Sequence, residues 1–359
     1  MATPTSRSQP QAQAWARQPH GLVVALLGLA LAWLPPGACA QNAVGALYLA
    51  NRATGAHAFA YIDLQGQFQQ TYEIPGHPTS EVLGLTHMVS TPNGFLLYNA
   101  DTGQAVVIGI AHTGYPYIGN YYAFSPGWQH IVPLGDSLFF YQGDGSGALG
   151  YITPEGQFVQ RRSYAPGTFA SWSHITATDN HLFFYNRDLG AVAVAAIDAS
   201  YDISQTHTVT TGALADLSYL VTTGPFVLLY SQATGTAVFG MITHAGQYEL
   251  LEVLDLPAGY NKLVRHDRFL VLYNSNAGGG TVGYVERYGA LGVPEFIVTQ
   301  EPPFSAGWTR IVSTKEDVLF YNSVTGLAAV GHLDHAGQFQ QTHTLTLATG
   351  WGFIAAGAR

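Results

Sequence analysis

The residues of this sequence best suited to chemistry recur in one short phrase, Trp-x-polar-Ile. Its seven versions are Leu85-Thr86-His87-Met88, Trp128-Gln129-His130-Ile131, Trp172-Ser173-His174-Ile175, Leu217-Ser218-Tyr219-Leu220, Tyr260-Asn261-Lys262-Leu263, Trp308-Thr309-Arg310-Ile311 and Trp351-Gly352-Phe353-Ile354. Residues i and i+2 of a strand lie on one face, so the third residue lies beside the aromatic ring. A flat ring next to a hydrogen-bond donor matches a sugar, which has an apolar face and hydroxyl edges.

Sequence motifs for catalysis or metal binding are missing. The chain has no Gly-x-Ser-x-Gly motif and no phosphate-binding loop, and its one cysteine is Cys39. The three histidines of the phrase come from successive copies and have no second ligand nearby in sequence, so we expect no metal and no cofactor. A glycosidase needs two facing carboxylates. No Asp or Glu recurs in the phrase, so only carboxylates from separate repeats would permit a glycoside hydrolase or lyase.

A second phrase, Leu-Phe-Tyr-Asn followed by Gly, indicates which elements position the first. Its tyrosine slot falls at positions 50, 98, 141, 185, 230, 273 and 321, which is a period in the forties. The last repeat divides into four β-type runs at 308–312, 318–321, 327–333 and 338–347, separated by turn-forming residues. Four strands repeated seven times predict an all-β, seven-bladed β-propeller with four-stranded blades.

The two ends of the repeat array predict how the ring closes. The first repeat begins at Ala46, inside its second strand, and the last repeat is followed by a spare first strand from Trp351 to Ile354. We therefore expect the C-terminal strand to pair with the N-terminal blade. Closure of this kind removes exposed sheet edges, which otherwise promote aggregation.

The first strand of a propeller blade is innermost, so the Trp-x-polar-Ile phrase should meet the Asn-x-x-Thr-Gly turns around the channel mouth. The candidate ligand-binding residues are Trp128, His130, Trp172, His174, Trp308, Arg310, Trp351 and His87. The same residues also permit a purely structural interpretation, in which they bind no ligand. In that case the aromatic rings fill the wedges between blades, and the polar residues bond the backbone of a neighbouring blade.

The N-terminus has the three parts of a secretory signal peptide. An uncharged apolar run from Gly21 to Leu34 follows two arginines and precedes Ala38-Cys39-Ala40. We expect residues 1–40 to be the signal peptide, cleaved after Ala40, and residues 41–359 to form a single propeller domain that is secreted or periplasmic. Lipidation at Cys39 is the alternative, although the residue three positions earlier is Pro36 rather than an aliphatic residue.

Composition limits the partners. The chain carries 13 Lys and Arg residues against 22 Asp and Glu residues, which gives a formal net charge of −9. An acidic surface of this kind argues against nucleic acid. The N-terminal apolar run is too short to span a bilayer comfortably, so we do not expect an integral membrane protein. The expected partner is a glycan or cell-surface polysaccharide, with a protein partner as the alternative.

The repeats resemble those of secreted lectin-type β-propellers, the tachylectin-like proteins, and of uncharacterised bacterial exported propellers with Trp-x-His-Ile and Leu-Phe-Tyr-Asn units. The resemblance covers Ala46 to Arg359. It implies neutral or N-acetylated sugars as ligands. The sequence therefore favours a non-enzymatic, carbohydrate-binding propeller with repeated sites between blades. The alternatives are a protein-interaction scaffold of the cell envelope and a glycoside hydrolase or lyase.

Overall fold

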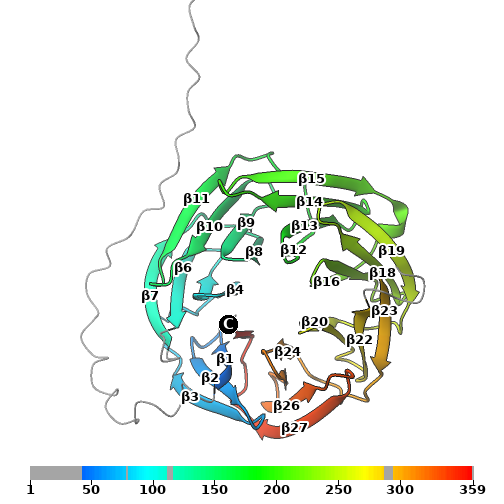
Figure 1. Cartoon of the computed structure of the whole chain (residues 1–359). Coiled ribbons are helices and arrows are strands. Elements are labelled where there is room, and N and C mark those ends of the chain that lie inside the picture. Colours follow the sequence, from blue (N-terminus) through cyan, green and yellow to red (C-terminus); the bar gives the residue numbers. More distant parts are fainter. Residues whose placement is uncertain (1–42, 78–79, 111–115, 287–293, 358–359) are drawn as a thin grey trace, which may run out of the picture.

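Seven four-stranded antiparallel sheets surround a common axis and form a closed β-propeller (Figure 1). The structure is a computed structural model that describes residues 43–77, 80–110, 116–286 and 294–357. No helix in this part of the chain has the length and apolar character needed to cross a bilayer. The predicted seven-bladed, all-β fold is confirmed. The expected signal peptide, with Cys39 and the cleavage site after Ala40, lies outside the described residues.

The blades are numbered along the chain, and the strands of each run from the inner strand outward. Blade 1 contains β28 (Phe353–Ala356), β1 (Ala43–Ala50), β2 (His57–Asp63) and β3 (Phe68–Ile74). Blade 2 contains β4 (His87–Thr91), β5 (Gly94–Tyr98), β6 (Gln104–Ile110) and β7 (Pro116–Ala123). Blade 3 contains β8 (His130–Leu134), β9 (Ser137–Tyr141), β10 (Gly147–Ile152) and β11 (Phe158–Tyr164). Blade 4 contains β12 (His174–Ala177), β13 (His181–Asn186), β14 (Ala191–Ile197) and β15 (Ile203–Thr210).

After the short 3-10 helix η1 (Gly212–Leu214), blade 5 contains β16 (Tyr219–Thr223), β17 (Phe226–Tyr230), β18 (Thr236–Ile242) and β19 (Tyr248–Asp255). Blade 6 contains β20 (Lys262–His266), β21 (Phe269–Tyr273), β22 (Gly280–Glu286) and β23 (Glu295–Gln300). Blade 7 contains β24 (Arg310–Ser313), β25 (Val318–Tyr321), β26 (Leu327–Leu333) and β27 (Phe339–Thr346). The four strands predicted for the last repeat overlap β24 to β27, with identical bounds for β25 and β26.

The burial of the strands explains their residue types. Every residue of β5, β17 and β21 is buried, because the second strand of a blade has protein on both faces. These strands accordingly read as continuous apolar runs ending in tyrosine. Outer strands such as β15 alternate half-buried and exposed side chains, which matches their alternating Thr and apolar or His residues. The hydrophobic core is therefore a series of clusters between successive blades.

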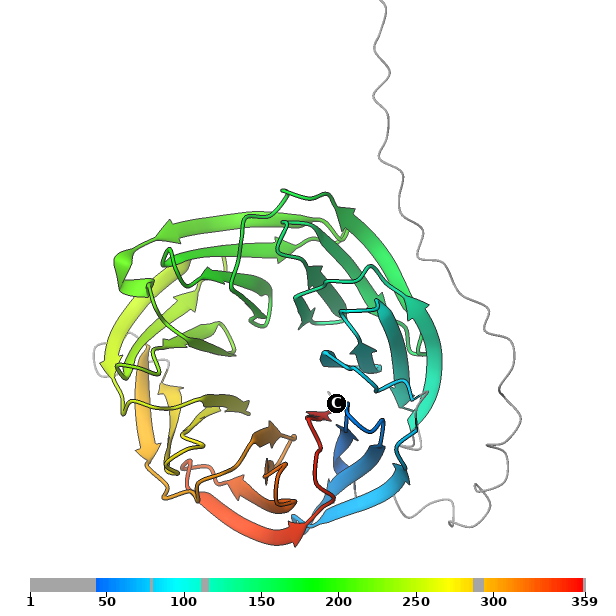
Figure 2. The ribbon, with the colours of Figure 1, turned by 180° about the vertical axis from the view of Figure 1, so that it is seen from behind.

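The ring closes as predicted from the two ends of the repeat array. Strand β28 pairs antiparallel with β1, with Leu47 opposite Ala356 and Ala50 opposite Phe353. Figure 2 shows this last segment, in red, beside the blue strands of blade 1. Trp351, just before β28, is 1% exposed and packs with residues of blades 1 and 7.

A bulge recurs in the outer hairpin of all seven blades, where the third and fourth strands pair. Several bulges carry a glycine beneath the aromatic residue that opens the outer strand. A Cβ on Gly240 would lie 2.5 Å from the Tyr248 ring, and one on Gly331 would lie 2.3 Å from Phe339. These glycines thus allow the aromatic ring to cover the sheet. A bulge also increases the local twist of the sheet.

Tyrosine hydroxyls tie each blade to the next. The hydroxyl of Tyr141 in blade 3 donates to the carbonyl of Ala170 at 2.9 Å and accepts from the Trp172 N–H at 3.0 Å, at the entrance to blade 4. The same pair of bonds is made by Tyr98, Tyr185, Tyr230, Tyr273 and Tyr321. The Leu-Phe-Tyr-Asn phrase therefore supplies a latch between blades. Blade 1 has Ala50 in this slot and so lacks the hydroxyl.

The glycine that ends this phrase is required by the backbone. Gly103 has a φ of +76°, and a Cβ there would lie 2.2 Å from the carbonyl oxygen of Phe124. That close approach allows the Phe124 N–H to donate to the Gly103 carbonyl at 2.8 Å. The turn and the segment leaving the blade are thus held together by a residue that cannot carry a side chain.

Candidate active site at the axis of the propeller

Seven residues, one from each blade, begin the inner strands at one end of the propeller axis. We call this set the axial ring: His87, His130, His174, Tyr219, Lys262, Arg310 and Phe353. Each is the first residue of its inner strand, and the inner strands of neighbouring blades are in contact all around the ring. All seven side chains are half-buried, so each remains partly accessible to solvent. The axial ring is the third position of the Trp-x-polar-Ile phrase.

In blades 2, 4, 6 and 7 the residue before the axial-ring residue braces the turn between the second and third strands of its own blade. The Thr86 hydroxyl accepts from the Ala100 N–H at 2.9 Å, and the Ser173 hydroxyl accepts from the Arg187 N–H at 2.9 Å. Thr309 makes the equivalent bond to Ser323. The inner strand and the Asn-x-x-Thr-Gly turn therefore meet at one end of the propeller, as predicted.

Several axial-ring residues also bond the next blade. His87 Nε2 lies 3.0 Å from the Gln129 carbonyl of blade 3, and Arg310 Nε donates to the Gly352 carbonyl at 2.7 Å, at the entrance to β28. The carbonyl of Ser173 lies beside the His130 ring and favours its protonated form. These residues therefore bond the backbone of the neighbouring blade, as the structural interpretation of the polar position expects. The bonds fix the orientation of their side chains.

Two imidazoles of the axial ring, those of His130 and His174, have a lowered pKa. Burial lowers the pKa of His130, and the neighbouring His174 and His87 lower it further. Burial, followed by Arg187, lowers the pKa of His174. A histidine whose pKa lies below its ordinary value is mostly unprotonated at pH 7, which is the form that can accept a proton.

One of the three imidazoles differs from the others in its local partners. Thr86 Oγ1 lies 2.8 Å from His87 Nδ1, and Ser173 Oγ lies 2.9 Å from His174 Nδ1. His130 instead follows Gln129, whose exposed side chain has no hydroxyl to offer. His130 is therefore the histidine of the ring best able to take a proton from a bound water.

The opposite side of the axial ring is positively charged. Lys262 and Arg310 come from the neighbouring blades 6 and 7, and the ring order puts these blades across the axis from blade 3. Burial lowers the pKa of Lys262, and the charge of Arg310 lowers it further. None of the seven inner strands contains Asp or Glu, and among the described residues neither cation forms an ion pair with a carboxylate. Two like charges without a carboxylate favour the binding of an anion at this end of the axis.

The structure separates the predicted tryptophans from this ring. Trp128, Trp308 and Trp351 are 5%, 7% and 1% exposed, and they pack in the clusters between blades. Trp172 alone is half-buried. Of the eight predicted site residues, the axial ring brings together His87, His130, His174 and Arg310. It adds Lys262 and Tyr219, which were not predicted as site residues although they occupy the same slot of the phrase. Among the described residues, no three His, Cys, Asp or Glu side chains form a group able to hold a metal ion.

Comparison with known proteins supports the fold at low sequence identity. No protein-family model and no curated protein sequence matches the chain. Among solved structures, a periplasmic gluconolactonase of Pseudomonas aeruginosa matches with a TM-score of 0.61 and 15% identity, over 88% of this chain and 99% of that one. A Bacteroides fragilis protein provisionally assigned as a 6-phosphogluconolactonase has a TM-score of 0.65 and 9% identity, over 90% and 100% of the two chains. A Bacteroides uniformis protein with the same provisional assignment has a TM-score of 0.63 and 12% identity, over 87% and 99%.

The expectation of a non-enzymatic lectin is wrong. These three similar propellers are of the lactonase type, and none of the three is a lectin. The resemblance to propellers is confirmed, whereas the resemblance to lectins has no support. The physical reason lies in the tryptophans. Aromatic rings next to polar residues indicated sugar platforms, but three of the four rings are buried between blades and present no open face.

Proposed function

We propose that this propeller is a hydrolase that opens the lactone ring of a small sugar acid at the axial ring. The observation that carries the proposal is the composition of that ring. His130 and His174, whose pKa values are lowered, belong to blades 3 and 4, while Lys262 and Arg310 belong to blades 6 and 7, and no inner strand contains a carboxylate. A glycosidase would require two carboxylates here, so of the hydrolase reactions lactone opening fits the ring better.

The residues suit the steps of this reaction. His130 accepts a proton from a water molecule as the water oxygen bonds to the lactone carbonyl carbon. The carbonyl oxygen then becomes an oxyanion, which the charges of Lys262 and Arg310 stabilise. The carbon–oxygen bond of the lactone ring breaks, and the imidazolium returns its proton to the departing ring oxygen. The product is an open hydroxy acid, which releases the second water proton to solvent, and its carboxylate remains attracted to the same two cations.

The similar propellers support this reaction class. A gluconolactonase and two proteins provisionally assigned as 6-phosphogluconolactonases share the fold over nearly their whole length. Their identity to this chain is 9–15%, so the likeness itself extends to the fold. Because a phosphorylated or carboxylated substrate would meet the unpaired cations of the axial ring, the electrostatics of this chain agree independently with an anionic sugar derivative.

The test is lactone hydrolysis by the purified protein, corrected for the spontaneous reaction, with δ-gluconolactone and 6-phosphogluconolactone as substrates. His130→Gln should reduce kcat/KM by about 10²–10⁴-fold, the usual contribution of a general base. The acid limb of the wild-type pH profile should lie below about pH 6.5, the ordinary histidine pKa, because burial lowers the pKa of His130.

His335→Gln is the matched control, because His335 is an exposed histidine in the turn between β26 and β27. It should retain wild-type activity. The proposal fails if the wild-type protein does not accelerate either reaction, or if His130→Gln and His335→Gln have equal activity. His87→Gln should have an intermediate effect, because its Nδ1 already meets the Thr86 hydroxyl.

A further inference from the structure

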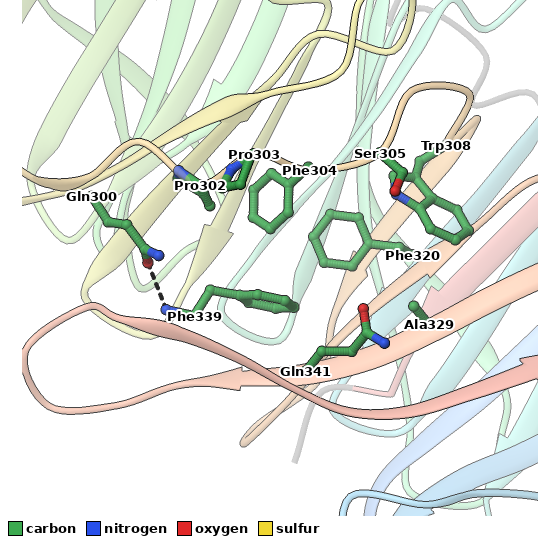
Figure 3. Close-up of a pocket in the computed structure, with 10 residues that line it drawn as sticks. All are labelled: Gln300, Pro302, Pro303, Phe304, Ser305, Trp308, Phe320, Ala329, Phe339 and Gln341. Carbon is green, nitrogen blue, oxygen red and sulfur yellow. Dashed lines mark hydrogen bonds between the residues drawn. The ribbon is translucent and has the colours of Figure 1, made fainter.

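A pocket of about 240 Å³ lies between blades 6 and 7, and no axial-ring residue lines it (Figure 3). Phe304, Phe320 and Phe339 form its aromatic wall, with Trp308 at one end. Figure 3 shows the three phenylalanine rings grouped around one space, with the amides of Gln300 and Gln341 beside it. The proposed lactone hydrolysis does not use this pocket.

The same aromatic cluster occurs between blades 2 and 3. The rings of Phe304 and Phe339 are 5.1 Å apart and those of Phe304 and Phe320 are 5.0 Å apart. The equivalent rings of Phe124 lie 4.9 Å from Phe158 and 5.6 Å from Phe140. Each cluster also has its tryptophan, since Trp308 packs on Phe320 as Trp128 packs on Phe140. The two junctions are therefore copies of one arrangement.

The copy in blades 2 and 3 has an additional ring that the pocket lacks. Tyr122 of β7 lies 5.6 Å from Phe124 and 6.0 Å from Phe158, and its hydroxyl accepts from the Phe158 N–H at 2.7 Å. Between blades 3 and 4, Tyr164 does the same. It packs on Phe169 at 5.2 Å and accepts from the Ile203 N–H at 3.0 Å. At both junctions a phenol ring seals the cluster.

Register identifies what replaces this tyrosine in blade 6. Tyr122 lies opposite Ala105, which follows the turn and pairs with Tyr98. In blade 6 the residue that pairs with the equivalent Tyr273 is Gly280. The N–H of Gly280 donates to the carbonyl of Pro302 at 3.1 Å, so Pro302 occupies the tyrosine position. A proline ring is much smaller than a phenol, and the pocket is the space that the missing side chain leaves.

The hydrogen bond of the missing phenol has been taken over by another residue. Gln300, the last residue of β23, lies two positions before Pro302, and its Oε1 accepts from the Phe339 N–H at 2.7 Å. The backbone donor is thus satisfied without the tyrosine, and the pocket does not depend on an unpaired group. The site is stable when empty because its polar requirement is already met.

We propose that this pocket binds the ring of a small phenolic compound, in the position that a tyrosine occupies at the two other junctions. The wall offers the edge-to-face contacts that aromatic rings prefer, as between Phe304 and Phe339 with an interplanar angle of 82°. The exposed Gln341 and Ser305 line the pocket, so a ligand can enter from solvent and meet polar groups for its hydroxyl. Apolar protein cavities of about 150 Å³ already bind benzene, so the space is sufficient for one ring.

The test uses p-cresol, which is the side chain of tyrosine as a free molecule, with binding measured by calorimetry and by the NMR signal of the Trp308 indole N–H. The wild-type protein should bind one p-cresol saturably at millimolar concentration and shift the Trp308 signal. Pro302→Tyr should fill the pocket and abolish this binding. Tyr122→Ala should open an equivalent space between blades 2 and 3 and raise the stoichiometry to two.

Pro166→Tyr is the matched control, because Pro166 is an exposed proline in the segment that leaves blade 3. It should bind p-cresol as the wild type does. If Pro302→Tyr does not fold, Gln341→Trp supplies the same information, because Gln341 is exposed and its replacement would cover the pocket. Absence of saturable binding to the wild type overturns the proposal, as does equal binding by the wild type and a folded pocket-filling variant. Neither outcome depends on lactone hydrolysis.

Discussion

The hydroxyl of Tyr98 in blade 2 accepts a hydrogen bond from the backbone N–H of Trp128, at the entrance to blade 3, with a distance of 3.2 Å. The same hydroxyl donates to the carbonyl of Ser125 at 2.8 Å. One phenol oxygen therefore satisfies two backbone groups of the connecting segment. Six blades use this arrangement, so the stability of the ring depends on these tyrosine hydroxyls.

Tyr98→Phe should lower the stability of the propeller. The change leaves the buried Trp128 N–H and the Ser125 carbonyl without their partner, and an unsatisfied buried polar group costs about 1–3 kcal/mol. The midpoint of urea unfolding checks this expectation. Tyr72→Phe is the control, because Tyr72 is 45% exposed on an outer strand and should unfold at the wild-type urea concentration. Equal midpoints for both variants would contradict the role given to the latch.

Trp351→Ala should be far more destabilising than Trp172→Ala. Trp351 is 1% exposed, and removal of a buried tryptophan costs about 3–5 kcal/mol because a cavity remains. Trp172 is half-buried, so its replacement by alanine should lower the free energy of unfolding by less. Thermal unfolding of the two variants measures the difference. If Trp351→Ala unfolds at the wild-type temperature, the tryptophan slot is not the packing element that its burial indicates.

Asp317→Asn should stabilise the protein near neutral pH and have no effect near pH 4. Burial raises the pKa of Asp317 to about 6, and Glu316 and Asp63 contribute to the rise while His332 opposes it. The folded state therefore binds the proton more tightly than the unfolded state, whose pKa is about 3.9. The stability that protonation contributes is fully present below about pH 4 and is lost as the pH rises through 6.

Unfolding midpoints of the wild type and Asp317→Asn at pH 4 and pH 7.5 distinguish a stabilisation that depends on pH from one that does not. Asp136→Asn, in the exposed turn between β8 and β9 of blade 3, should change neither midpoint. A stabilisation by Asp317→Asn that is the same at both pH values would show that charge burial is not its cause.

Lys262→Met should weaken the binding of an anionic product more than that of a neutral substrate. A hydrogen bond to a charged group contributes about 1.5–3 kcal/mol, so the inhibition constant of 6-phosphogluconate should rise roughly tenfold or more. The KM for δ-gluconolactone should change less. Lys315→Met removes the other described lysine, which pairs with Glu316 at the far end of β24, and should leave both constants unchanged. Equal effects of the two lysine variants would remove Lys262 from the proposed site.

The fold could be predicted from sequence because its determinants are local and repeated. The tyrosine slot marks a buried second strand in each blade, and the displaced Trp351 phrase predicts closure through β28. The polar members of the axial ring could also be predicted, since they share one slot of that phrase. The sequence left open which of the aromatic rings are buried between blades. Trp128 and Trp172 occupy identical slots, yet only Trp128 is buried.

The pocket between blades 6 and 7 could not be predicted for a related reason. Its existence depends on Pro302 lying opposite Gly280, and that register is set across the bulge between Val282 and Gly283. Pro302 and Tyr122 both lie six residues before the tryptophan that follows them, so the sequence does align the two positions. The sequence does not show that the Tyr122 ring seals its junction, and so it does not show that a space remains at Pro302.

The pairing of β28 with β1 has a consequence for how the protein is made. Blade 1 lacks its inner strand until the C-terminal residues have left the ribosome, so during synthesis β1 has an open edge at Leu47 to Ala50. Open strand edges pair readily with other chains. The segment that enters β28 is then held by the latch of blade 7, because the Tyr321 hydroxyl accepts from the Trp351 N–H. A chain that ends before Phe353 would keep this edge, and a chaperone that holds it during synthesis would protect the strand pairing through which the whole ring closes.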